Sequence, residues 1–283
     1  MKEVTIRVPA TTSNLGPGYD ALGVALRIYN RVTVRRVGDG EARLIDNLPA
    51  AAAAMFFSIA KSEPFPFVWE IAGDVPRARG LGSSVTVRLG LIAGLNALAG
   101  RPLGRHRLFD ICATLERHPD NAAPATFGGF TVAGEKEVAQ FPVAPELHFV
   151  LLIPDFEIAT PDARRVLPAS IDRLGAARSC ANACRITAAF ASQNYALLGG
   201  AFEDHLHQPY REKALIPFLS AVIRAGENAG ALGGFLSGSG STICCVTVDR
   251  VDDVGRAMLS AAPAGSHIVI ANADNKGAAE IEN

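Results

Sequence analysis

The stretch "PRARGLGSSVTVRLGLIAGLNALA", residues 76–99, decides the fold. From residue 84 to residue 99 its side chains are apolar nearly all round, which predicts a helix buried along its whole length. Gly90 and Gly94 would let a neighbouring element pack closely on this helix, because glycine has no Cβ. The sequence therefore predicts a central buried helix against which other elements pack.

A glycine loop leads into this helix. Gly80 and Gly82 let main-chain N–H groups approach a ligand closely, and Ser83 or Ser84 can cap the helix. The start of a buried helix offers unpaired N–H donors and the positive end of the helix dipole, which together favour a phosphate. An ordinary capped helix explains the same residues about as well. A Walker A loop is excluded, because no Gly-Lys-Ser/Thr follows.

The composition indicates a chain that can bury a substantial core. Its 283 residues fit two modest domains or one large one, and 49% of them are hydrophobic. A net charge of −1 excludes a strongly basic nucleic-acid binder. The longest apolar run, residues 48–60, is 13 residues long and too short to span a bilayer, so we expect no membrane partner.

The N-terminus and the cysteines predict a cytoplasmic protein. The opening "MKEVTIRV" lacks the apolar core of a signal peptide. The number of cysteines is odd and no CxxC occurs, which predicts buried thiols in a reducing compartment rather than disulfides or a zinc site. The five are Cys112, Cys180, Cys184, Cys244 and Cys245.

Strand and helix patterns are mixed along the chain, which favours the α+β class. Residues 3–8 alternate between apolar and polar side chains, as in a half-buried antiparallel strand. Pro142 and Pro145 precede a new strand, so we expect domains at 1–145 and 146–283. Further strands are expected at 31–36, 67–72, 128–134, 147–155, 244–249 and 267–272, and helices at 50–61, 108–118, 180–198 and 216–229.

A second glycine cluster, at residues 11–23, allows an alternative fold. Gly16, Gly18 and Ala21 satisfy the dinucleotide fingerprint GxGxxG/A after a strand, as in a Rossmann oxidoreductase. Two features oppose this alternative. Arg7 interrupts a strand that should be continuously apolar, and seven residues separate the strand from the first glycine. A plain surface turn explains the glycines but not the polar residues clustered beside them.

A third cluster, "GGFLSGSGSTICCV" at residues 233–246, lies between two expected strands. Its five small residues "SGSGS" exceed what a hairpin turn needs. A main chain pressed against a ligand or against a neighbouring loop would need them.

The three clusters together resemble a known family. "PATTSNLGPGYD" (9–20), "PRARGLGSSV" (76–85) and "GFLSGSGST" (234–242) are similar, in this order, to the three motifs of the GHMP kinases. These enzymes phosphorylate galactose, homoserine, mevalonate and phosphomevalonate. Within the family, "LERHPDNAAPATFGGFTVAG" (115–134), "TPDARRVLP" (160–168) and "QPYREKALIP" (208–217) look like the homoserine kinases.

The resemblance implies a fold and an activity. The expected fold is a ribosomal S5 domain 2-like N-terminal domain followed by a ferredoxin-like C-terminal domain, with ATP and magnesium (Mg²⁺) in the cleft between them. The expected reaction is ATP-dependent phosphorylation of the side-chain hydroxyl of L-homoserine to O-phospho-L-homoserine, in threonine biosynthesis. Homoserine and ATP are the expected partners, and a homodimer is compatible with these features.

The chain departs from the family pattern at three positions. Val85 and Thr86 stand where two alanines are usual, and Ser241 stands where a proline is usual. Two alternatives therefore stay open. One is a GHMP kinase for another small hydroxylated amino acid or metabolite, such as threonine. The other is a nucleotide-binding homologue without turnover.

The resemblance also places the nucleotide and the metal. Mg²⁺ prefers hard oxygen ligands, which Ser84 and Glu116 offer. Glu116 lies at the edge of the apolar stripe of its expected helix, whereas Asp110 points away from that stripe. The resemblance selects Ser84 and Glu116 as metal ligands. It implies that ATP is bound by Pro76, Arg79, Gly80, Leu81, Gly82, Ser83, Ser84, Gly238, Ser239 and Gly240.

The segment "HPDN" forms a polar loop, because Pro119 ends the preceding helix. The resemblance places His118, Asp120 and Asn121 of this loop at the transferred phosphoryl group. In sibling families the aspartate acts as a base, whereas in homoserine kinases the asparagine is thought to orient the hydroxyl. We expect neither to be an essential base, because phosphoryl transfer can run mostly on positioning and charge neutralisation.

Homoserine carries a carboxylate and an ammonium, and the sequence offers partners for both. Arginine suits a carboxylate because its planar fork pairs two oxygens. The resemblance places Arg164 and Arg211 on the carboxylate, and Asp20 with Asn14 can take the ammonium. Mevalonate has no ammonium, so these residues favour an amino acid. Thr160 and His118 complete the expected substrate site, and Arg164 is also expected near the reacting groups.

Three other charged side chains are expected at the surface. Arg165 follows Arg164 and is expected to be solvated. His205 and His207 are spaced two apart, so on a helix they would diverge, which predicts a surface pair rather than a metal site.

Overall fold

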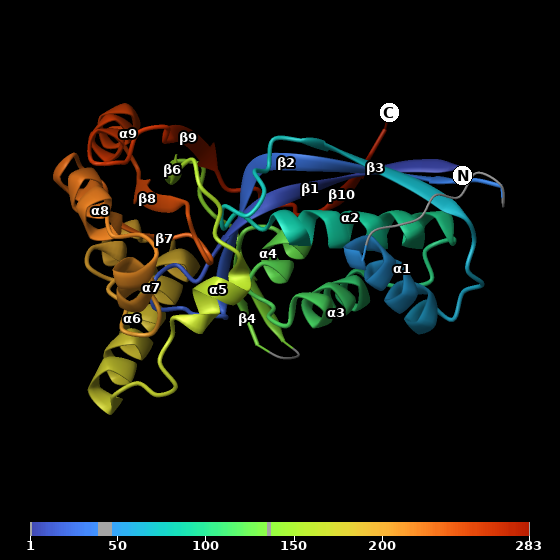
Figure 1. The fold of residues 1–283 in the computed structure, drawn as a ribbon, viewed down its shortest axis with the longest axis horizontal. Coiled ribbons are helices and arrows are strands. Elements are labelled where there is room, and N and C mark those ends of the chain that lie inside the picture. The colour runs from blue at the N-terminus through green and yellow to red at the C-terminus, as the bar shows by residue number, and fades with distance from the viewer. Residues whose placement is uncertain (1, 39–46, 135–136, 283) are drawn as a thin grey trace.

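Strands from both ends of the chain form the first sheet (Figure 1). The structure is a computed structural model that describes residues 2–38, 47–134 and 137–282. Its first sheet has the order β10–β1–β2–β4–β5, with β3 also paired to β2, and every pair is antiparallel. These strands are β1 (Glu3–Ser13), β2 (Leu22–Arg36), β3 (Phe67–Gly73), β4 (Phe130–Ala133), β5 (Val138–Phe141) and β10 (Ala279–Ile281).

This antiparallel sheet shows that the Rossmann alternative was wrong. A dinucleotide-binding fold needs β1 to pair in parallel with its neighbours. Here β1 pairs antiparallel with β2 and β10. Arg7 is half-buried near the centre of β1, but the other residues of the strand after Glu3 are buried, so the expectation of a half-buried strand was only partly right.

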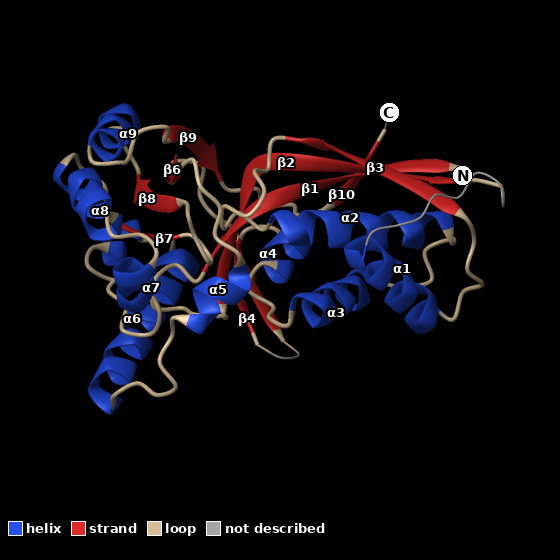
Figure 2. Cartoon of the chain, viewed as in Figure 1, coloured by secondary structure: helices blue, strands red, loops and turns tan. Residues whose placement is uncertain are grey.

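Helices cover one face of the first sheet (Figures 1 and 2). The buried helix α2 packs against β1 and β2. A Cβ added at Gly90 would lie 2.5 Å from Cγ2 of Val32, and one at Gly94 would lie 2.5 Å from Cγ2 of Val34. The expectation that these glycines allow close packing is therefore confirmed. The helices of this layer are α1 (Asn47–Ala60), α2 (Ser83–Leu98), α3 (Arg105–Glu116) and α4 (Ala122–Phe127).

The second sheet has the order β7–β8–β6–β9 and is also antiparallel. Its strands are β6 (His148–Ile153), β7 (Gly233–Leu236), β8 (Ile243–Thr247) and β9 (His267–Asn272). The helices α8 and α9 pack against each other and on this sheet. The helices of this half are α5 (Thr160–Arg165), α6 (Arg173–Ser192), α7 (Gln208–Ala214), α8 (Leu219–Asn228) and α9 (Val251–Ser260), with a 3₁₀ turn η1 (Tyr195–Leu198).

One hydrophobic core joins the two halves. Phe130 from the first sheet stacks on Phe190 of α6, with ring centroids 4.2 Å apart, and the same cluster includes Phe149 and Phe235 of the second sheet. The expected boundary at 145/146 falls in the loop between β5 and β6. However, β10 returns across it to pair with β1, so the last residues of the chain complete the first sheet.

The structure corrects two expectations about this half. The helix expected at 180–198 begins earlier, at Arg173, where Asp172 accepts from the N–H of Gly175, and it ends at Ser192 before a separate 3₁₀ turn. The thiols of Cys180 and Cys184 are exposed on α6, whereas the other three are buried. No helix within the described residues is long and apolar enough to cross a membrane.

Candidate active site

The loop before α2 is held against the loop between β7 and β8. A Cβ on Gly80 would lie 2.1 Å from the carbonyl oxygen of Ser237, and the Ser237 hydroxyl donates to the Gly80 carbonyl at 2.7 Å. The N–H of Thr242 donates to the carbonyl of Arg79 at 3.2 Å. The small residues of the third cluster thus serve close packing against a neighbouring loop, one of the two possibilities that the sequence left open.

The end of β1 joins the same assembly. The hydroxyls of Thr12 and Ser237 are 2.8 Å apart, and the N–H of Thr11 donates to the carbonyl of Leu81 at 3.2 Å. A Cβ on Gly82 would lie 2.1 Å from Oγ1 of Thr11, so only glycine fits there. Three segments far apart in sequence therefore meet at one place.

A pocket of about 570 Å³ opens beside these loops and is lined by most of the expected site residues. Pro76, Leu81 and Gly240 do not line it, and Leu81 is fully buried behind the loop. The expected residues that line the pocket are Asn14, Asp20, Arg79, Gly80, Gly82, Ser83, Ser84, Glu116, His118, Asp120, Asn121, Thr160, Arg164, Arg211, Gly238 and Ser239.

One side of this pocket is an apolar wall that the sequence did not reveal. Trp69 and Ile71 come from β3, and Leu48 and Pro49 come from α1. The sequence indicated an apolar helix over residues 48–60 and a strand over 67–72, with no motif to mark these side chains as part of a site. Only the approach of α1 and β3 to the glycine loop brings them together.

The helix α2 begins without a side-chain cap. Gly82 is the N-cap residue in the left-handed conformation, and no side chain of the described residues caps the helix, so the expected capping by Ser83 or Ser84 was wrong. The hydroxyl of Ser84 instead donates to Oε2 of Glu116 at 2.9 Å. The first N–H groups of α2 are therefore not capped by a side chain, and they lie at the pocket edge.

Glu116 has a second partner that the sequence did not suggest. The Arg88 guanidinium on α2 forms a hydrogen-bonded ion pair with Oε1 of Glu116. The two side chains are 19% and 8% exposed, so the pair is largely shielded from water. Arg88 lies one helical turn after Ser84, which places both side chains on the same helix face.

The loop after α3 holds His118, Asp120 and Asn121 together. Nδ1 of His118 is 2.7 Å from Oδ1 of Asp120, which also accepts from the N–H of Asn121 at 3.0 Å. Burial alone would raise the pKa of Asp120, but the hydrogen bond and charge of His118 outweigh it and lower that pKa. Burial alone would lower the pKa of His118, but Asp120 raises it. Asp120 is therefore held ionised.

Asn121 is fixed by two hydroxyls of β1. Its Oδ1 accepts from the hydroxyl of Thr11 at 2.7 Å, and its Nδ2 donates to the hydroxyl of Ser13 at 2.9 Å. Thr11 and Ser13 lie in the first motif but were not singled out from the sequence. They orient the amide that borders the pocket.

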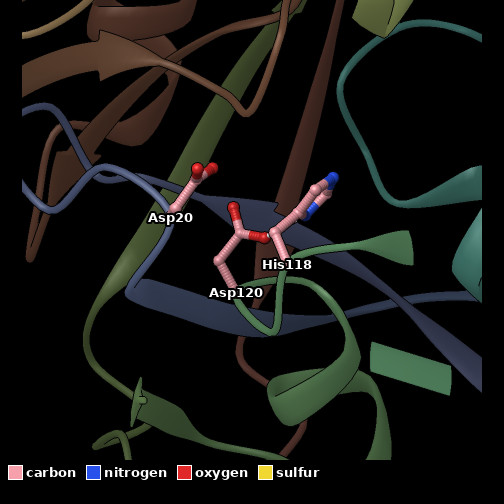
Figure 3. A group of neighbouring side chains, drawn as sticks. All are labelled: Asp20, His118 and Asp120. Carbon is pink, nitrogen blue, oxygen red and sulfur yellow. Dashed lines mark hydrogen bonds and ion pairs between the residues drawn. The ribbon is translucent and has the colours of Figure 1, made fainter. Parts of the chain in front are cut away.

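Asp20 lies between Arg164 and the loop after α3. Figure 3 shows Asp20, His118 and Asp120 side by side, and one polar atom of each lies within 4.8 Å of the others. The Arg164 guanidinium donates to both carboxylate oxygens of Asp20. Asn14 accepts from the N–H of Asp20 at 3.0 Å, so Asn14 positions the Asp20 main chain.

Arg211 is buried beside this group, at 2% exposure. Its Nε donates to the carbonyl of Ala163 at 3.1 Å, and its Nη1 donates to the carbonyl of Gly238 at 2.8 Å. Arg211 lines the pocket, and among the described residues none accepts a hydrogen bond from its Nη2. Both arginines contact the ring of Tyr19, with the guanidinium carbons of Arg164 and Arg211 5.4 and 5.6 Å from its centroid.

His207 is not at the surface, so that expectation was wrong. Its side chain is fully buried, and its Nε2 lies 2.8 Å from the carbonyl oxygen of Gly16, to which it donates. Nδ1 then accepts from Nη1 of Arg211 at 3.1 Å. Burial lowers the pKa of His207 to about 4, so the imidazole is neutral at pH 7. His207 therefore orients Arg211.

Arg165 is 76% exposed and pairs with Asp162, as expected of a surface charge.

Known proteins show similarity over nearly the whole chain. Family models for the N-terminal and C-terminal domains of GHMP kinases match residues 47–129 and 186–264. A homoserine kinase from Synechococcus sp. is 40% identical over 91% of this chain and 90% of its own. One from Moorella thermoacetica is 39% identical, covering 90% of this chain and 91% of its own.

Solved structures agree with these relatives. The crystal structure of a homoserine kinase from Cytophaga hutchinsonii superposes with a TM-score of 0.89 and 26% identity, covering 99% of this chain and 98% of that one. A mevalonate kinase with 14% identity superposes with a TM-score of 0.72 over 96% of this chain and 100% of its own, a likeness of fold alone. The chain belongs to the GHMP kinase family.

Proposed function

We propose that this protein transfers the γ-phosphoryl group of ATP to the side-chain hydroxyl of L-homoserine, producing O-phospho-L-homoserine for threonine biosynthesis. The observation that carries the proposal is the placement of Asp20, Arg164 and Arg211 in the same pocket as the glycine loop. A pocket that joins a phosphate-type loop to partners for an ammonium and a carboxylate fits an amino acid as acceptor. The similarity to homoserine kinases over 90% or more of the chain supports that acceptor.

The nucleotide fits along the glycine loop. Main-chain N–H groups of residues 80–84 and the start of α2 would bind the phosphates, with Gly238 and Ser239 of the adjoining loop beside them. The apolar wall of Leu48, Trp69 and Ile71 would then contact the base. Arg79 lines the same pocket, but its guanidinium is directed to the loop before α5, where Nε donates to the carbonyl of Pro154 at 3.0 Å.

Ser84 and Glu116 fit a magnesium ion. A hydroxyl and a carboxylate oxygen 2.9 Å apart at the start of α2 are hard donors of the kind that Mg²⁺ prefers. When bound, the ion neutralises charge on the phosphates. Glu116 and Ser84 would hold it beside the glycine loop, and the chain contributes the orientation of these two groups.

Homoserine would enter at the Arg164–Asp20 pair. Its carboxylate would take the unused Nη2 of Arg211 together with Arg164, and its ammonium would lie against the carboxylates of Asp20 and Asp120. The substrate would thus replace part of the Arg164–Asp20 pair with two new ion pairs, one at its carboxylate and one at its ammonium. His207 keeps the fork of Arg211 in place for this exchange.

The hydroxyl would be oriented by Asn121, whose amide is already fixed by Thr11 and Ser13. Asp120 is a weak base because its pKa is lowered, so its charge contributes more than its proton affinity. The in-line attack would then depend on positioning, as is usual in phosphoryl transfer.

One assay tests this function against its alternatives. Purified protein with Mg²⁺-ATP is given homoserine, threonine, serine or mevalonate, and ADP release is followed. ADP release that depends on homoserine is the expected result. Preference for another hydroxylated compound would support a different acceptor, and ATP binding without turnover on any compound would support an inactive homologue.

We further propose a cytoplasmic location, since all five cysteines are free, as in a reducing compartment.

A further inference from the structure

We propose that Arg88 is a built-in counter-cation for Glu116, which holds off free divalent metal until the metal arrives with a nucleotide. This inference rests on the proposed metal site at Ser84 and Glu116. It assigns a role to a residue outside the three motifs that is not among the residues lining the pocket.

The placement of Arg88 follows from helix geometry. Arg88 lies four residues after Ser84 on α2, so both side chains project from one face of that helix. Glu116 closes α3, which packs beside α2. Its two carboxylate oxygens are divided, because Oε1 is taken by Arg88 and Oε2 by the Ser84 hydroxyl. Arg88 therefore fixes which oxygen faces the proposed metal position.

The burial of the pair makes the charge of Arg88 matter. Arg88 and Glu116 are 19% and 8% exposed, and Nε of Arg88 is buried without a hydrogen-bond partner in the described part of the chain. Glu116 is the ion-pair partner of Arg88 among those residues. A buried carboxylate without a cation is costly, so in the metal-free protein Arg88 supplies the compensation that a metal would otherwise give.

The same guanidinium opposes a second cation. A divalent ion on Oε2 would share one carboxylate with a unit positive charge, in surroundings that screen poorly. Free metal therefore binds weakly. A metal that arrives with a triphosphate brings its own negative charge, which offsets the repulsion from Arg88.

The test measures metal binding without catalysis. Mn²⁺ replaces Mg²⁺, and its affinity for the full protein is measured by electron paramagnetic resonance with no nucleotide and no homoserine. We expect Arg88→Met to bind Mn²⁺ at least about tenfold more tightly than the parent protein, because a nearby positive charge has been removed. Arg88→Lys, which keeps the charge, should bind as weakly as the parent protein.

Matched variants locate the effect. Arg107→Met removes an arginine from an exposed pair with Asp110 on α3, and it should leave Mn²⁺ affinity unchanged. Adding Glu116→Gln to Arg88→Met should abolish the gain. If Arg88→Met does not fold, Arg88→Gln serves the same purpose, because it is also uncharged.

Two results overturn the inference in distinguishable ways. If the Arg88 variants bind free Mn²⁺ no more tightly than the parent protein, while Glu116→Gln weakens nucleotide-dependent Mn²⁺ binding, the metal site stands and the role of Arg88 falls. If Glu116→Gln leaves nucleotide-dependent Mn²⁺ binding unchanged, the metal site itself is wrong, and the inference falls with it.

Discussion

The guanidinium of Arg164 donates to both carboxylate oxygens of Asp20, at 2.7 and 3.1 Å. The pair joins α5 to the loop between β1 and β2, and its side chains are 39% and 33% exposed at the pocket. A ligand that carries both charges can exchange with each partner of this pair without leaving either one unpaired. A zwitterionic amino acid has this property, whereas a neutral alcohol does not.

Arg164→Ala should therefore weaken homoserine and spare the nucleotide. We expect KM for homoserine to rise by roughly 10- to 100-fold, the cost of losing a bidentate contact, with ATP affinity within about twofold. The matched control is Arg165→Ala, which removes the adjacent exposed arginine and should change neither value. Steady-state kinetics and calorimetry of ATP binding give the two numbers. Comparable weakening of ATP would remove Arg164 from the acceptor site.

Arg211→Lys tests whether the fork of the second arginine is needed. In the buried Arg211, Nε donates to the carbonyl of Ala163, and Nη1 donates to the carbonyl of Gly238 and to His207. This leaves Nη2 for a ligand. Lysine keeps the charge but cannot satisfy these groups and reach the pocket together. KM for homoserine should rise by about tenfold or more while ATP affinity stays near normal. Equal losses for both ligands would mean that Arg211 supports the pocket as a whole.

His207 predicts a specific loss of stability in acid. Its pKa is lowered to about 4 in the folded protein, against an ordinary value of 6.5. The unfolded chain therefore takes up the proton first, so the contribution of His207 is complete above pH 6.5 and is lost as the pH falls toward 4. Between pH 7 and pH 5 the loss is on the order of 2 kcal/mol.

Urea unfolding at pH 7 and pH 5 measures this contribution when the parent protein is compared with His207→Gln. The variant should lose less stability over the interval. The comparison also removes the opposite contribution of His118, whose raised pKa adds stability below pH 6.5 that is lost as the pH rises through the raised value. Identical losses in both proteins would show that His207 is not buried as a neutral group.

Asp120→Asn separates charge from proton transfer. Without the Asp120 charge, burial should dominate and the pKa of His118 should fall, which NMR titration of the imidazole would show. If Asp120 acts only through its charge, kcat should fall by less than about a hundredfold. General acid–base catalysis typically contributes about 100- to 10,000-fold, so such a loss would lie below that range. A fall in kcat of about ten-thousandfold, in a variant that is folded and whose His118 imidazole still titrates, would make Asp120 the base instead.

Hydrophobic patterning predicted the main elements because apolar side chains recur along them at the spacing of a strand or in a helix-length run. The alternation at residues 3–8 became β1, and the apolar run after the glycine loop became α2. The return of β10 to β1 was not predicted, because a three-residue strand carries too little pattern to show its partner. Segment patterns identify elements, whereas pairing between distant strands is decided by tertiary packing.

The motifs identified the pocket, but not the residues that orient it. The spacing of His207 from His205 predicted a pair of surface histidines. His207 contacts Gly16 and Arg211 because the chain before α7 is buried, which the spacing does not show. Arg88 lies in an apolar helix with no signal beyond its charge. Such supporting residues act through contacts between distant segments, which one sequence does not display.

Gly80→Ala tests the contact between the two glycine loops. Gly80 has φ of +73°, and a Cβ there would lie 2.1 Å from the Ser237 carbonyl. Gly100 is the matched control, because it has φ of +84° but no atom of the described part of the chain within 4 Å of an added Cβ. Both alanines pay the strain of a positive φ, on the order of 1 kcal/mol, and only the first also forces the loops apart. Gly80→Ala should therefore weaken ATP by about tenfold or more, whereas Gly100→Ala should lower the melting temperature slightly and leave ATP affinity intact. Calorimetric titration with a non-hydrolysable ATP analogue decides, and equal ATP affinity in the two variants would show that the phosphates do not depend on this loop contact.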